Sequence, residues 1–266
     1  MSLPTLVIIH GGWHTPPSYT KLTSALRAAG PYEVHLPRLP STFPTRPPTA
    51  DLSTDTFFIK SYVSSLVEAG RTVVVLMHSY GGQVGTNALH GLGVNSRRER
   101  GLAGGVAKLI YLCAFALPEG KSMGDKVKEF GHEELMPLVF DFDEDGSVLC
   151  RDARGVLIGD VKEKEGGGKG LSEEEIEEYL GSLVRWNGKC MSDPLTGVAA
   201  WREIEVVYVY TRDDVCVPLA YQESMVRYLE GEGRKVETVL LETGHAPGLV
   251  DVEGVVGVVG RAVGGV

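Results

Sequence analysis

A serine at an abrupt change in sequence character is the first candidate for chemistry in this chain. The apolar residues 73–77 lead directly into H-S-Y-G-G, whose serine is Ser79. Such a sequence is typical of a buried strand that turns sharply into a helix, and the nucleophile-elbow motif G-x-S-x-G exposes its serine hydroxyl at this turn. Gly81 fills the last glycine position, whereas Met77 replaces the first. Ser79 is therefore a candidate nucleophile that needs a base, an acid and an oxyanion hole from elsewhere in the chain.

The base should be a histidine. A serine hydroxyl is a weak nucleophile by itself, and histidine suits the role of its base because it changes charge near neutral pH. Among the seven histidines, His245 lies in the segment E-T-G-H-A-P-G, directly after a predicted strand at residues 236–241. Loops at the carboxyl ends of parallel strands are where α/β sheets gather catalytic groups. We therefore expect His245 to be the base, and His10 and His78 to pack around the site.

Two adjacent carboxylates, Asp213 and Asp214, follow another predicted strand at residues 206–210. They give the chain order Ser, Asp, His, which is one of the orders known for such triads. A carboxylate in this position fixes the tautomer of the histidine and stabilises the imidazolium. Adjacent side chains point in different directions, so we expect one aspartate to reach His245. The residues alone do not decide which.

Backbone N–H groups should bind the negative oxygen that forms when the serine attacks a carbonyl. One donor is the residue after the nucleophile, here Tyr80. The other is expected in I-H-G-G-W-H, after the first predicted strand, because glycines let the backbone approach a reacting group. We expect the N–H of Gly12, with Trp13 and His14 contacting the substrate. A phosphate-binding loop is the competing interpretation, but neither G-K-[ST] nor G-x-G-x-x-G follows this strand.

Short apolar runs and helical stretches must position these groups. Near-continuous Val, Ile and Leu predict buried parallel strands at residues 6–10, 33–36, 73–77, 108–113, 206–210 and 236–241. Helical spacing of apolar residues predicts helices at 20–29 and 54–69. The alternation predicts an α/β fold with a mostly parallel central sheet and helices on both faces. The glycine-rich residues 250–266 suit a final helix or a frayed tail, since each glycine weakens a helix by about 1 kcal/mol relative to alanine.

Residues 118–200 interrupt this alternation of strands and helices, and no convincing strand is predicted within them. A capping-box pattern begins a helix at Ser172, and this helix is expected to carry Trp186. An insertion after the elbow, between two sheet strands, is placed to form a helical lid over an active site; a decorative insertion is the alternative. We therefore expect a core domain, 1–117 and 201–266, and a lid at 118–200. Trp186 is predicted to contact the substrate.

The composition excludes several classes of function. The chain has 266 residues, of which 43% are hydrophobic and 23% charged, as in an ordinary soluble globular protein. A net charge of −9 argues against nucleic-acid binding, which needs a basic surface to neutralise phosphates. The four cysteines form no C-x-x-C pair, and the histidines match no common zinc spacing. We therefore expect no metal and no cofactor.

The sequence also bears on where the protein works. No positively charged segment followed by a long apolar one stands at the start, so no signal peptide is expected. No apolar run approaches the ~20 residues that span a bilayer. Together with widely spaced cysteines, these features predict a cytoplasmic protein that does not bind membranes. The oligomeric state stays open, a homodimer included.

With these residues in place, the chain resembles the α/β-hydrolase superfamily, and within it the branch of plant methylesterases and hydroxynitrile lyases with their fungal relatives. The matching motifs are L-V-I-I-H-G-G-W-H, L-T-S-A-L-R-A-A-G, H-S-Y-G-G, Y-V-Y-T-R-D-D-V-C-V-P-L-A-Y-Q and T-G-H-A-P, in this order. The resemblance implies that Asp214 is the catalytic acid, with Asp213 as the alternative, because the branch places it four residues before a proline. It also implies an α/β-hydrolase fold and, after H-G, the oxyanion residue Gly12.

The departures from this branch are informative as well. Its hydroxynitrile lyases carry a threonine where Gly11 stands and a lysine where Ala246 stands. Both groups that handle cyanohydrin chemistry are missing, so the resemblance does not favour lyase activity.

The leading hypothesis is a serine hydrolase that cleaves a carboxylic ester, lactone or thioester through an acyl-enzyme, with a triad of Ser79, His245 and Asp214. The expected partner is a small hydrophobic ester-like substrate, whereas the apolar and aromatic residues of the expected lid would suit the bulky hydrophobic substrate of a biosynthetic enzyme. Two alternatives stay open. One is a biosynthetic accessory enzyme on the same scaffold, catalysing a lactonising acyl transfer, an isomerisation or a C–C cleavage. The other is a ligand receptor that turns over poorly.

Overall fold

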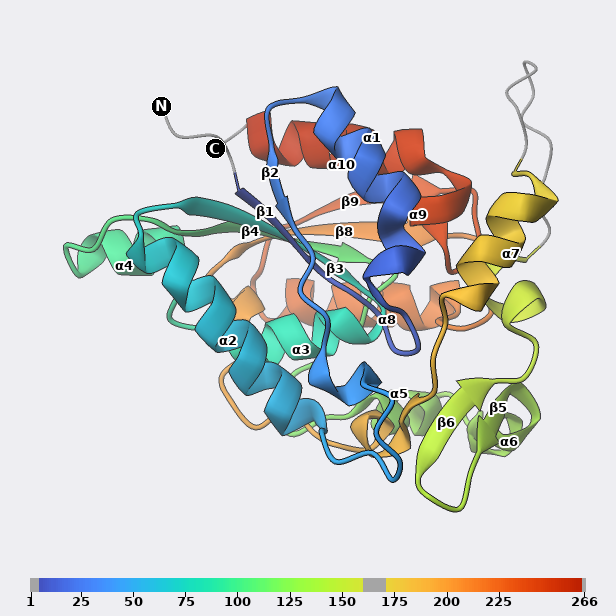
Figure 1. Ribbon diagram of the computed structural model, residues 1–266. Helices are drawn as coiled ribbons and strands as arrows, with labels where there is room; N and C mark the ends of the chain where they lie inside the picture. The colour runs from blue at the N-terminus through green and yellow to red at the C-terminus, as the bar shows by residue number, and fades with distance from the viewer. Residues whose placement is uncertain (1–4, 160–170, 265–266) are drawn as a thin grey trace.

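The computed structural model describes residues 5–159 and 171–264 and is built around one parallel sheet (Figure 1). The strand order is β2-β1-β3-β4-β8-β9, and every neighbouring pair is parallel. The six strands are β1 Thr5–Ile9, β2 Glu33–His35, β3 Thr72–His78, β4 Gly105–Leu112, β8 Glu205–Thr211 and β9 Val236–Leu241. All six predicted strands and the predicted α/β fold with a parallel central sheet are confirmed.

Alternate residues of the strands supply two cores, one on each face of the sheet. Val7 and Ile9 belong to the core beneath α2, α3 and α8, whereas Leu6 and Ile8 belong to the core beneath α1 and α10. Because successive side chains of a strand point to opposite faces, covering both faces explains why the strands have unbroken apolar sequences. The covering helices are α1 Thr20–Ala29, α2 Leu52–Glu68, α3 Tyr80–Ala88, α8 Leu219–Gly231 and α10 Val252–Gly264.

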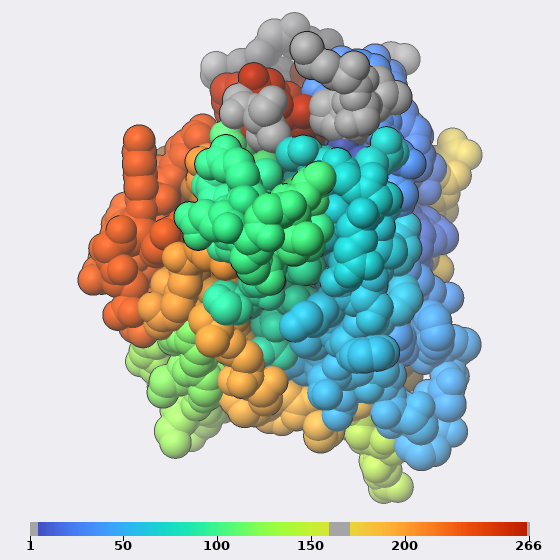
Figure 2. All heavy atoms as spheres, turned by 90° about the vertical axis from the view of Figure 1, so that its left-hand side faces the viewer, coloured from blue at the N-terminus to red at the C-terminus, as the bar shows by residue number. Residues whose placement is uncertain are grey.

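Packed helices cover the amino ends of the strands. Figure 2 faces this end of the molecule, where α4 (Val94–Glu99, green) lies between α2 (cyan) and α8 (orange). Arg97 of α4 is buried and donates hydrogen bonds to three backbone carbonyls. The loops after β1, β3, β8 and β9, which carry the predicted site residues, lie at the opposite, carboxyl end.

The C-terminal segment, which the sequence leaves undecided, forms helix α10 up to Gly264, and the last two residues lie outside the described part of the chain. Its buried residues recur at helical spacing: Val255, Val258, Val259, Ala262 and Val263. They pack in the core shared with α1. Burial of this apolar face, at about 25 cal/mol per Å², outweighs the low helix propensity of the glycines.

The segment inserted between β4 and β8 contains strands, contrary to the prediction of none. β5 (Phe140–Phe142), β6 (Ser147–Cys150) and β7 (Trp186–Asn187) form a small antiparallel sheet. These strands have two to four residues, too few for a period of two to stand out. The helix predicted at Ser172 is confirmed as α7 (Glu173–Gly181), with its capping box. It ends before Trp186, so the placement of Trp186 on this helix is wrong.

The remaining helices are short. They are α5 Met123–Glu129, α6 Met136–Val139, α9 Pro247–Val250, the 3₁₀ turns Pro16–Tyr19, Pro40–Thr42, Glu133–Leu135, Gly188–Met191 and Ala200–Arg202, and a π-helical turn at Arg154–Ile158. None of the helices in residues 5–159 and 171–264 combines the length and apolar character that a membrane crossing requires.

Candidate active site

Ser79 lies at the turn between β3 and α3 in a backbone conformation that side chains rarely adopt. Its φ is 54° and its ψ is −122°, outside the regions that are comfortable for residues with a Cβ. Gly81 lets the helix approach the sheet closely, because a Cβ there would lie 2.2 Å from the carbonyl oxygen of Ile9. The strained turn and the close approach together leave Ser79 at the carboxyl end of β3, as the elbow motif predicts.

The glycine that the motif lacks at position 77 is compensated on the helix. Met77 is fully buried, and a Cβ on Gly85 would lie 2.2 Å from its sulfur and 3.2 Å from Ile9 Cδ1. The large side chain on β3 therefore occupies space that a small residue on α3 leaves open. Met77 is accommodated by Gly85, and this pairing explains why the departure does not disturb the turn.

We predict that Gly85→Ala will create a steric conflict of about 1–3 kcal/mol that Met77→Ala, made in the same chain, relieves. Alanine also favours the helix by about 1 kcal/mol, so the informative quantity is the coupling energy from urea unfolding of the two single variants and the double variant. We expect about 1 kcal/mol or more. Gly81→Ala is the matched control, since its Cβ meets a backbone oxygen that Met77→Ala cannot move. Additive effects of the Gly85 and Met77 substitutions would contradict the compensation.

Ser79, His245 and Asp214 form a continuous hydrogen-bonded chain although they come from three separate loops. Nε2 of His245 lies 2.8 Å from Oγ of Ser79, and Nδ1 of His245 lies 2.8 Å from Oδ2 of Asp214. All three side chains are buried. When the Nδ1 proton faces the carboxylate, Nε2 remains free to accept the serine proton. Residues that were selected separately from the sequence are thus in direct contact.

Asp214, and not Asp213, makes the contact with His245. The Oδ1 atom of Asp214 accepts two backbone N–H groups of its own turn, at 2.7 and 2.9 Å. Its Oδ2 atom accepts the hydroxyl of Thr211 at 2.9 Å in addition to the histidine ring. Asp213 is exposed to solvent. The carboxylate that faces the histidine is therefore held by four hydrogen bonds.

The charge of Asp214 sets the proton affinity of His245. Burial lowers the pKa of His245, but the charge and hydrogen bond of Asp214, together with the nearby sulfurs of Cys113 and Cys216, raise it by more in sum, so that the pKa lies well above the usual value for histidine. The nearby His10, His14 and His78 have their pKa lowered by burial, to about 4 for His10 and about 3 for His14. Those rings stay neutral at physiological pH and serve as hydrogen-bonding groups.

A second hydrogen-bond chain connects the backbone around these groups. The N–H of Gly11 donates to the hydroxyl of Tyr19 at 3.1 Å, and this hydroxyl lies 2.6 Å from Nδ1 of His78. Nε2 of His78 lies 2.8 Å from the carbonyl of His245. If Tyr19 donates to His78, then His78 donates to that carbonyl, and the chain runs in one direction. It joins the loop after β1, the last residue of β3 and the loop after β9, and no signal in the sequence pointed to Tyr19.

A buried carboxylate behind the elbow was also missed. Asp55 of α2 accepts hydrogen bonds from the N–H and hydroxyl of Ser41, at 3.0 and 2.5 Å, and from the hydroxyl of Tyr80 at 2.8 Å. The Ser41 hydroxyl in turn accepts Nε1–H of Trp186 at 3.0 Å. This chain links the residue after the nucleophile to the inserted segment. In the sequence, Asp55 resembles any acidic residue in the first turn of a helix, so no signal distinguished it.

Asp55 should make stability depend on pH. Burial raises the pKa of Asp55 to about 6, from 3.8, so the folded state holds this proton more tightly than the unfolded chain. Its stabilising contribution is complete below pH ~4 and is lost as the pH rises through ~6, by about 3 kcal/mol. Asp55→Asn should remove this loss, so the variant should gain stability relative to wild type between pH 4 and 7. Urea unfolding across this range measures the difference, and a constant offset between the two proteins would contradict it.

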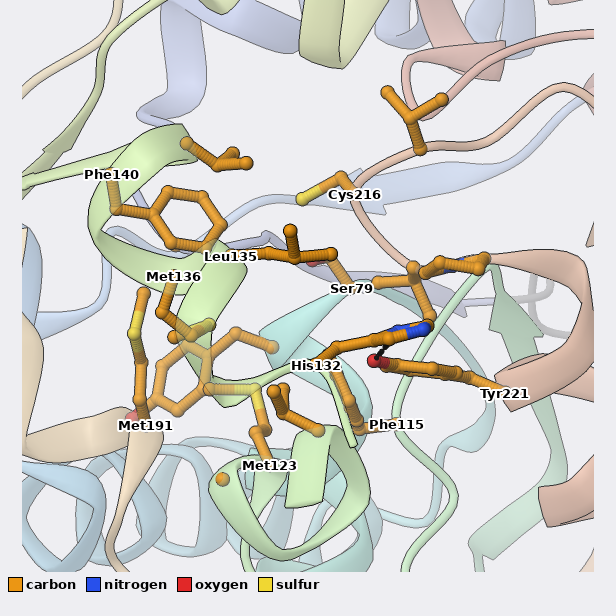
Figure 3. Close-up of a pocket in the computed structure, with 18 of the residues that line it drawn as sticks. Ser79, Phe115, Met123, His132, Leu135, Met136, Phe140, Met191, Cys216 and Tyr221 are labelled. Carbon is orange, nitrogen blue, oxygen red and sulfur yellow. Dashed lines mark hydrogen bonds between the residues drawn. The ribbon is translucent and has the colours of Figure 1, made fainter. Parts of the chain in front are cut away.

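A cavity of about 300 Å³ opens beside Ser79 (Figure 3). Gly12 and Tyr80, the predicted oxyanion donors, line it together with Ser79. Most of the remaining wall is apolar or contains sulfur, and the inserted segment supplies much of it: Met123, Val127, Leu135, Met136, Val139, Phe140 and Met191. The volume falls at the lower end of the range for small-molecule sites.

Two of the three predicted substrate contacts lie on this wall. Trp13 and Trp186 line the cavity, and the Trp186 ring lies 2.8 to 3.0 Å from where a Cβ on Gly12 would be. His14 is not among the lining residues. Its Nδ1 lies 2.6 Å from the carbonyl of Gly12 and its Nε2 lies 2.6 Å from the hydroxyl of Tyr179. His14 therefore supports the loop that carries Gly12 from behind.

One group of side chains has the composition of a metal site. Ligand atoms of His78, Cys113 and His245 lie within 4.8 Å of one another. Both ring nitrogens of each histidine already have hydrogen-bond partners, and a metal ion would displace the bond between His245 and Ser79. The four cysteines are all unpaired thiols. The group is therefore better described as part of the packing around Ser79.

The fold and the contacts at the carboxyl ends of its strands are those of an α/β hydrolase. The profile of the Alpha/beta hydrolase family matches residues 6–258, and the chain belongs to this family. It is 32% identical over 272 residues to "Alpha/beta hydrolase nvfD" of Aspergillus novofumigatus, an alignment that covers 99% of this chain and 98% of that protein.

Solved structures share the same fold. The methylesterase MES16 from Arabidopsis superposes with a TM-score of 0.74 at 17% identity, covering 99% of this chain and 100% of the other. A pyrethroid hydrolase from Sphingobium faniae gives a TM-score of 0.70 at 22% identity, covering 98% and 97%. The resemblance to the superfamily is confirmed: the family profile and a fungal hydrolase match the sequence, and a plant methylesterase shares the fold.

Proposed function

We propose that this protein is a serine hydrolase that cleaves a carboxylic ester, lactone or thioester with Ser79, His245 and Asp214 as its catalytic triad. The observation that carries this proposal is the unbroken chain of two 2.8 Å hydrogen bonds through these residues beside an apolar cavity. Membership of the α/β-hydrolase family supports it.

In this proposal Oγ of Ser79 attacks the carbonyl carbon while Nε2 of His245 takes its proton. His245 then delivers this proton to the leaving alcohol or thiol. Water then loses a proton to the same nitrogen and attacks the acyl carbon; the bond from this carbon to Oγ of Ser79 breaks, the carboxylic acid leaves, and His245 returns the proton to Oγ. Asp214 holds the tautomer of His245 and stabilises the imidazolium in both steps.

The N–H groups of Gly12 and Tyr80 are the proposed oxyanion donors. Tyr80 is the first residue of α3, where N–H groups have no intrahelical acceptor and the helix end carries partial positive charge. Both residues line the same cavity as Ser79. Donors of this kind contribute about 10²–10³ in rate.

An apolar wall supports a small hydrophobic substrate. The cavity volume, about 300 Å³, suits a compact molecule. A structural relative is by name a methylesterase, which favours an ester among the three acyl classes. The lid role of residues 118–200 belongs to this proposal, because side chains of that segment form much of the cavity wall.

Ser79→Ala should reduce the hydrolysis of p-nitrophenyl esters to background and abolish labelling by a fluorophosphonate probe, because both reactions need Oγ of Ser79. Ser18→Ala is the matched control: it removes a buried serine hydroxyl that bonds to Ser182 and lies outside the triad, so labelling should persist. Unchanged labelling of Ser79→Ala would refute the assignment. Tight ligand binding by the wild type with negligible turnover would favour a receptor instead.

Asp214→Asn should lower kcat by about 10⁴ and move the acid limb of the pH profile to lower pH. The reason is that neutral His245 is the base, and the Asp214 carboxylate raises the pKa of His245. Without this charge the ring loses its proton at lower pH. Asp213→Asn is the control, since Asp213 is exposed, and should change neither quantity. The measurement is kcat/KM against pH for the three proteins; an unmoved limb in Asp214→Asn would contradict the coupling.

A further inference from the structure

Two polar side chains of the cavity have no role in the chemistry proposed above. His132 follows α5 in the inserted segment, and Tyr221 lies in the first turn of α8. Nδ1 of His132 lies 2.8 Å from the hydroxyl of Tyr221, and the rings stack with centroids 5.7 Å apart (Figure 3). Both residues line the cavity beside Ser79. We refer to them as the cavity pair.

Most other polar side chains that line the cavity direct their hydrogen bonds away from it. The indole N–H groups of Trp13 and Trp186 donate to protein acceptors at 3.0 Å, and the hydroxyl of Tyr80 donates to a carboxylate at 2.8 Å. The carboxylate of Asp214 is held by its own turn and by the triad. Among the described lining residues, apart from the weakly polar thiol of Cys216, the cavity pair and Ser79 therefore hold the side-chain hydrogen-bonding capacity that a ligand can use.

The protons of the cavity pair determine which hydrogen-bond donors and acceptors it presents to a ligand. A neutral histidine has one N–H and a tyrosine has one O–H. One of these two protons lies in the bond between Nδ1 and the tyrosine oxygen. If Tyr221 donates, Nε2–H of His132 remains as a donor and the tyrosine oxygen as an acceptor. If His132 donates, the O–H remains as a donor and Nε2 as an acceptor. In both cases the pair presents one donor and at least one acceptor, which suits a hydroxyl or carbonyl group.

The pair is held in place from both sides. The ring of Phe130 packs against Tyr221 with centroids 4.5 Å apart, and Lys126 donates to a hydroxyl of α8 at 3.1 Å. The carboxamide of Gln222, the next residue, bonds to the turn that carries Asp214. Burial raises the pKa of Tyr221, so its phenol keeps its proton at neutral pH. A group bound to the pair therefore has a fixed position relative to the triad.

We propose that the cavity pair binds a hydroxyl or carbonyl oxygen on the apolar body of the substrate. The preferred substrates are then cyclic or aromatic esters or lactones that carry such an oxygen away from the scissile carbonyl. This inference rests on the proposed hydrolase function. A substrate without this oxygen would bury the remaining donor of the pair unpaired, and sites of this kind discriminate strongly against such analogues.

The test uses methyl naphthoates that carry one hydroxyl on the ring remote from the ester, each compared with the isostere that has a methyl group there. Wild type should hydrolyse at least one hydroxyl regioisomer with a kcat/KM about tenfold above its isostere, the ratio expected for one hydrogen bond. Tyr221→Phe keeps the ring and its packing. It should lower this ratio toward one, because kcat/KM for the hydroxyl compound falls more than kcat/KM for its methyl isostere.

Tyr62→Phe is the matched control. Tyr62 makes the same kind of bond, 2.7 Å from Nδ1 of His35, and neither residue lines the cavity. This variant should keep the wild-type preference for the hydroxyl compound. A preference lost in both tyrosine variants would indicate a general structural effect and overturn the assignment to the cavity pair.

Binding to Ser79→Ala, followed by tryptophan fluorescence, supplies a readout that does not need turnover. The preferred hydroxyl compound should bind about tenfold more tightly than its isostere, and adding Tyr221→Phe should remove the difference. If wild type hydrolyses no ester while this binding difference holds, the proposed hydrolase fails and the recognition by the pair stands. The other outcome is that wild type hydrolyses the esters while Tyr221→Phe changes kcat/KM for each hydroxyl compound and its methyl isostere by the same factor. This result would refute recognition by the cavity pair and support the hydrolase function.

Discussion

The site depends on how closely α3 approaches the end of β1. At Gly81 the helix lies so near the Ile9 carbonyl that no side chain fits between them. Every residue of α3 is buried, so packing on all sides holds the strained conformation of Ser79. This approach also places the elbow beside the loop after β1, and so allows Gly12 and Tyr80 to line one cavity. A helix displaced by a side chain at position 81 would separate these groups.

Buried polar groups around the elbow are connected in chains, and each chain fixes two or more loops. An unpaired buried group costs about 1–3 kcal/mol, so a displacement of one loop would break bonds in its neighbours. The two buried carboxylates illustrate how the surroundings decide a role. Asp214 lies beside His245 and can stabilise a positive charge there. Asp55 accepts only neutral donors, and burial raises its pKa, so it suits a positioning role.

The parallel sheet and the contacts among Ser79, His245 and Asp214 could be predicted from the sequence because both follow from local signals. Unbroken apolar runs reveal strands that are covered on both faces, and catalytic groups follow such strands at their carboxyl ends. Chain order and a loop position were enough to select His245 for Ser79. The compensation of Met77 by Gly85 could not be predicted, because it depends on which side chains face each other across β3 and α3. The glycines of α10 have low helix propensity, so the sequence did not decide whether this segment is helical. Burial of its apolar face in the tertiary structure stabilises the helix.

The inserted segment is where prediction from sequence was weakest, and Trp186 shows why. It belongs to a strand of two residues, too short to leave a pattern, yet its ring packs 4.6 Å from that of Tyr80 and excludes any side chain at Gly12. Its indole N–H completes the chain to Asp55 through Ser41. The segment that supplies much of the cavity wall thus also supports both proposed oxyanion donors. Substrate choice and the geometry around Ser79 are therefore coupled. The apolar wall residues of the inserted segment other than Trp186 can vary with the substrate, whereas Trp186 is constrained by Gly12, Ser41 and Tyr80 at once.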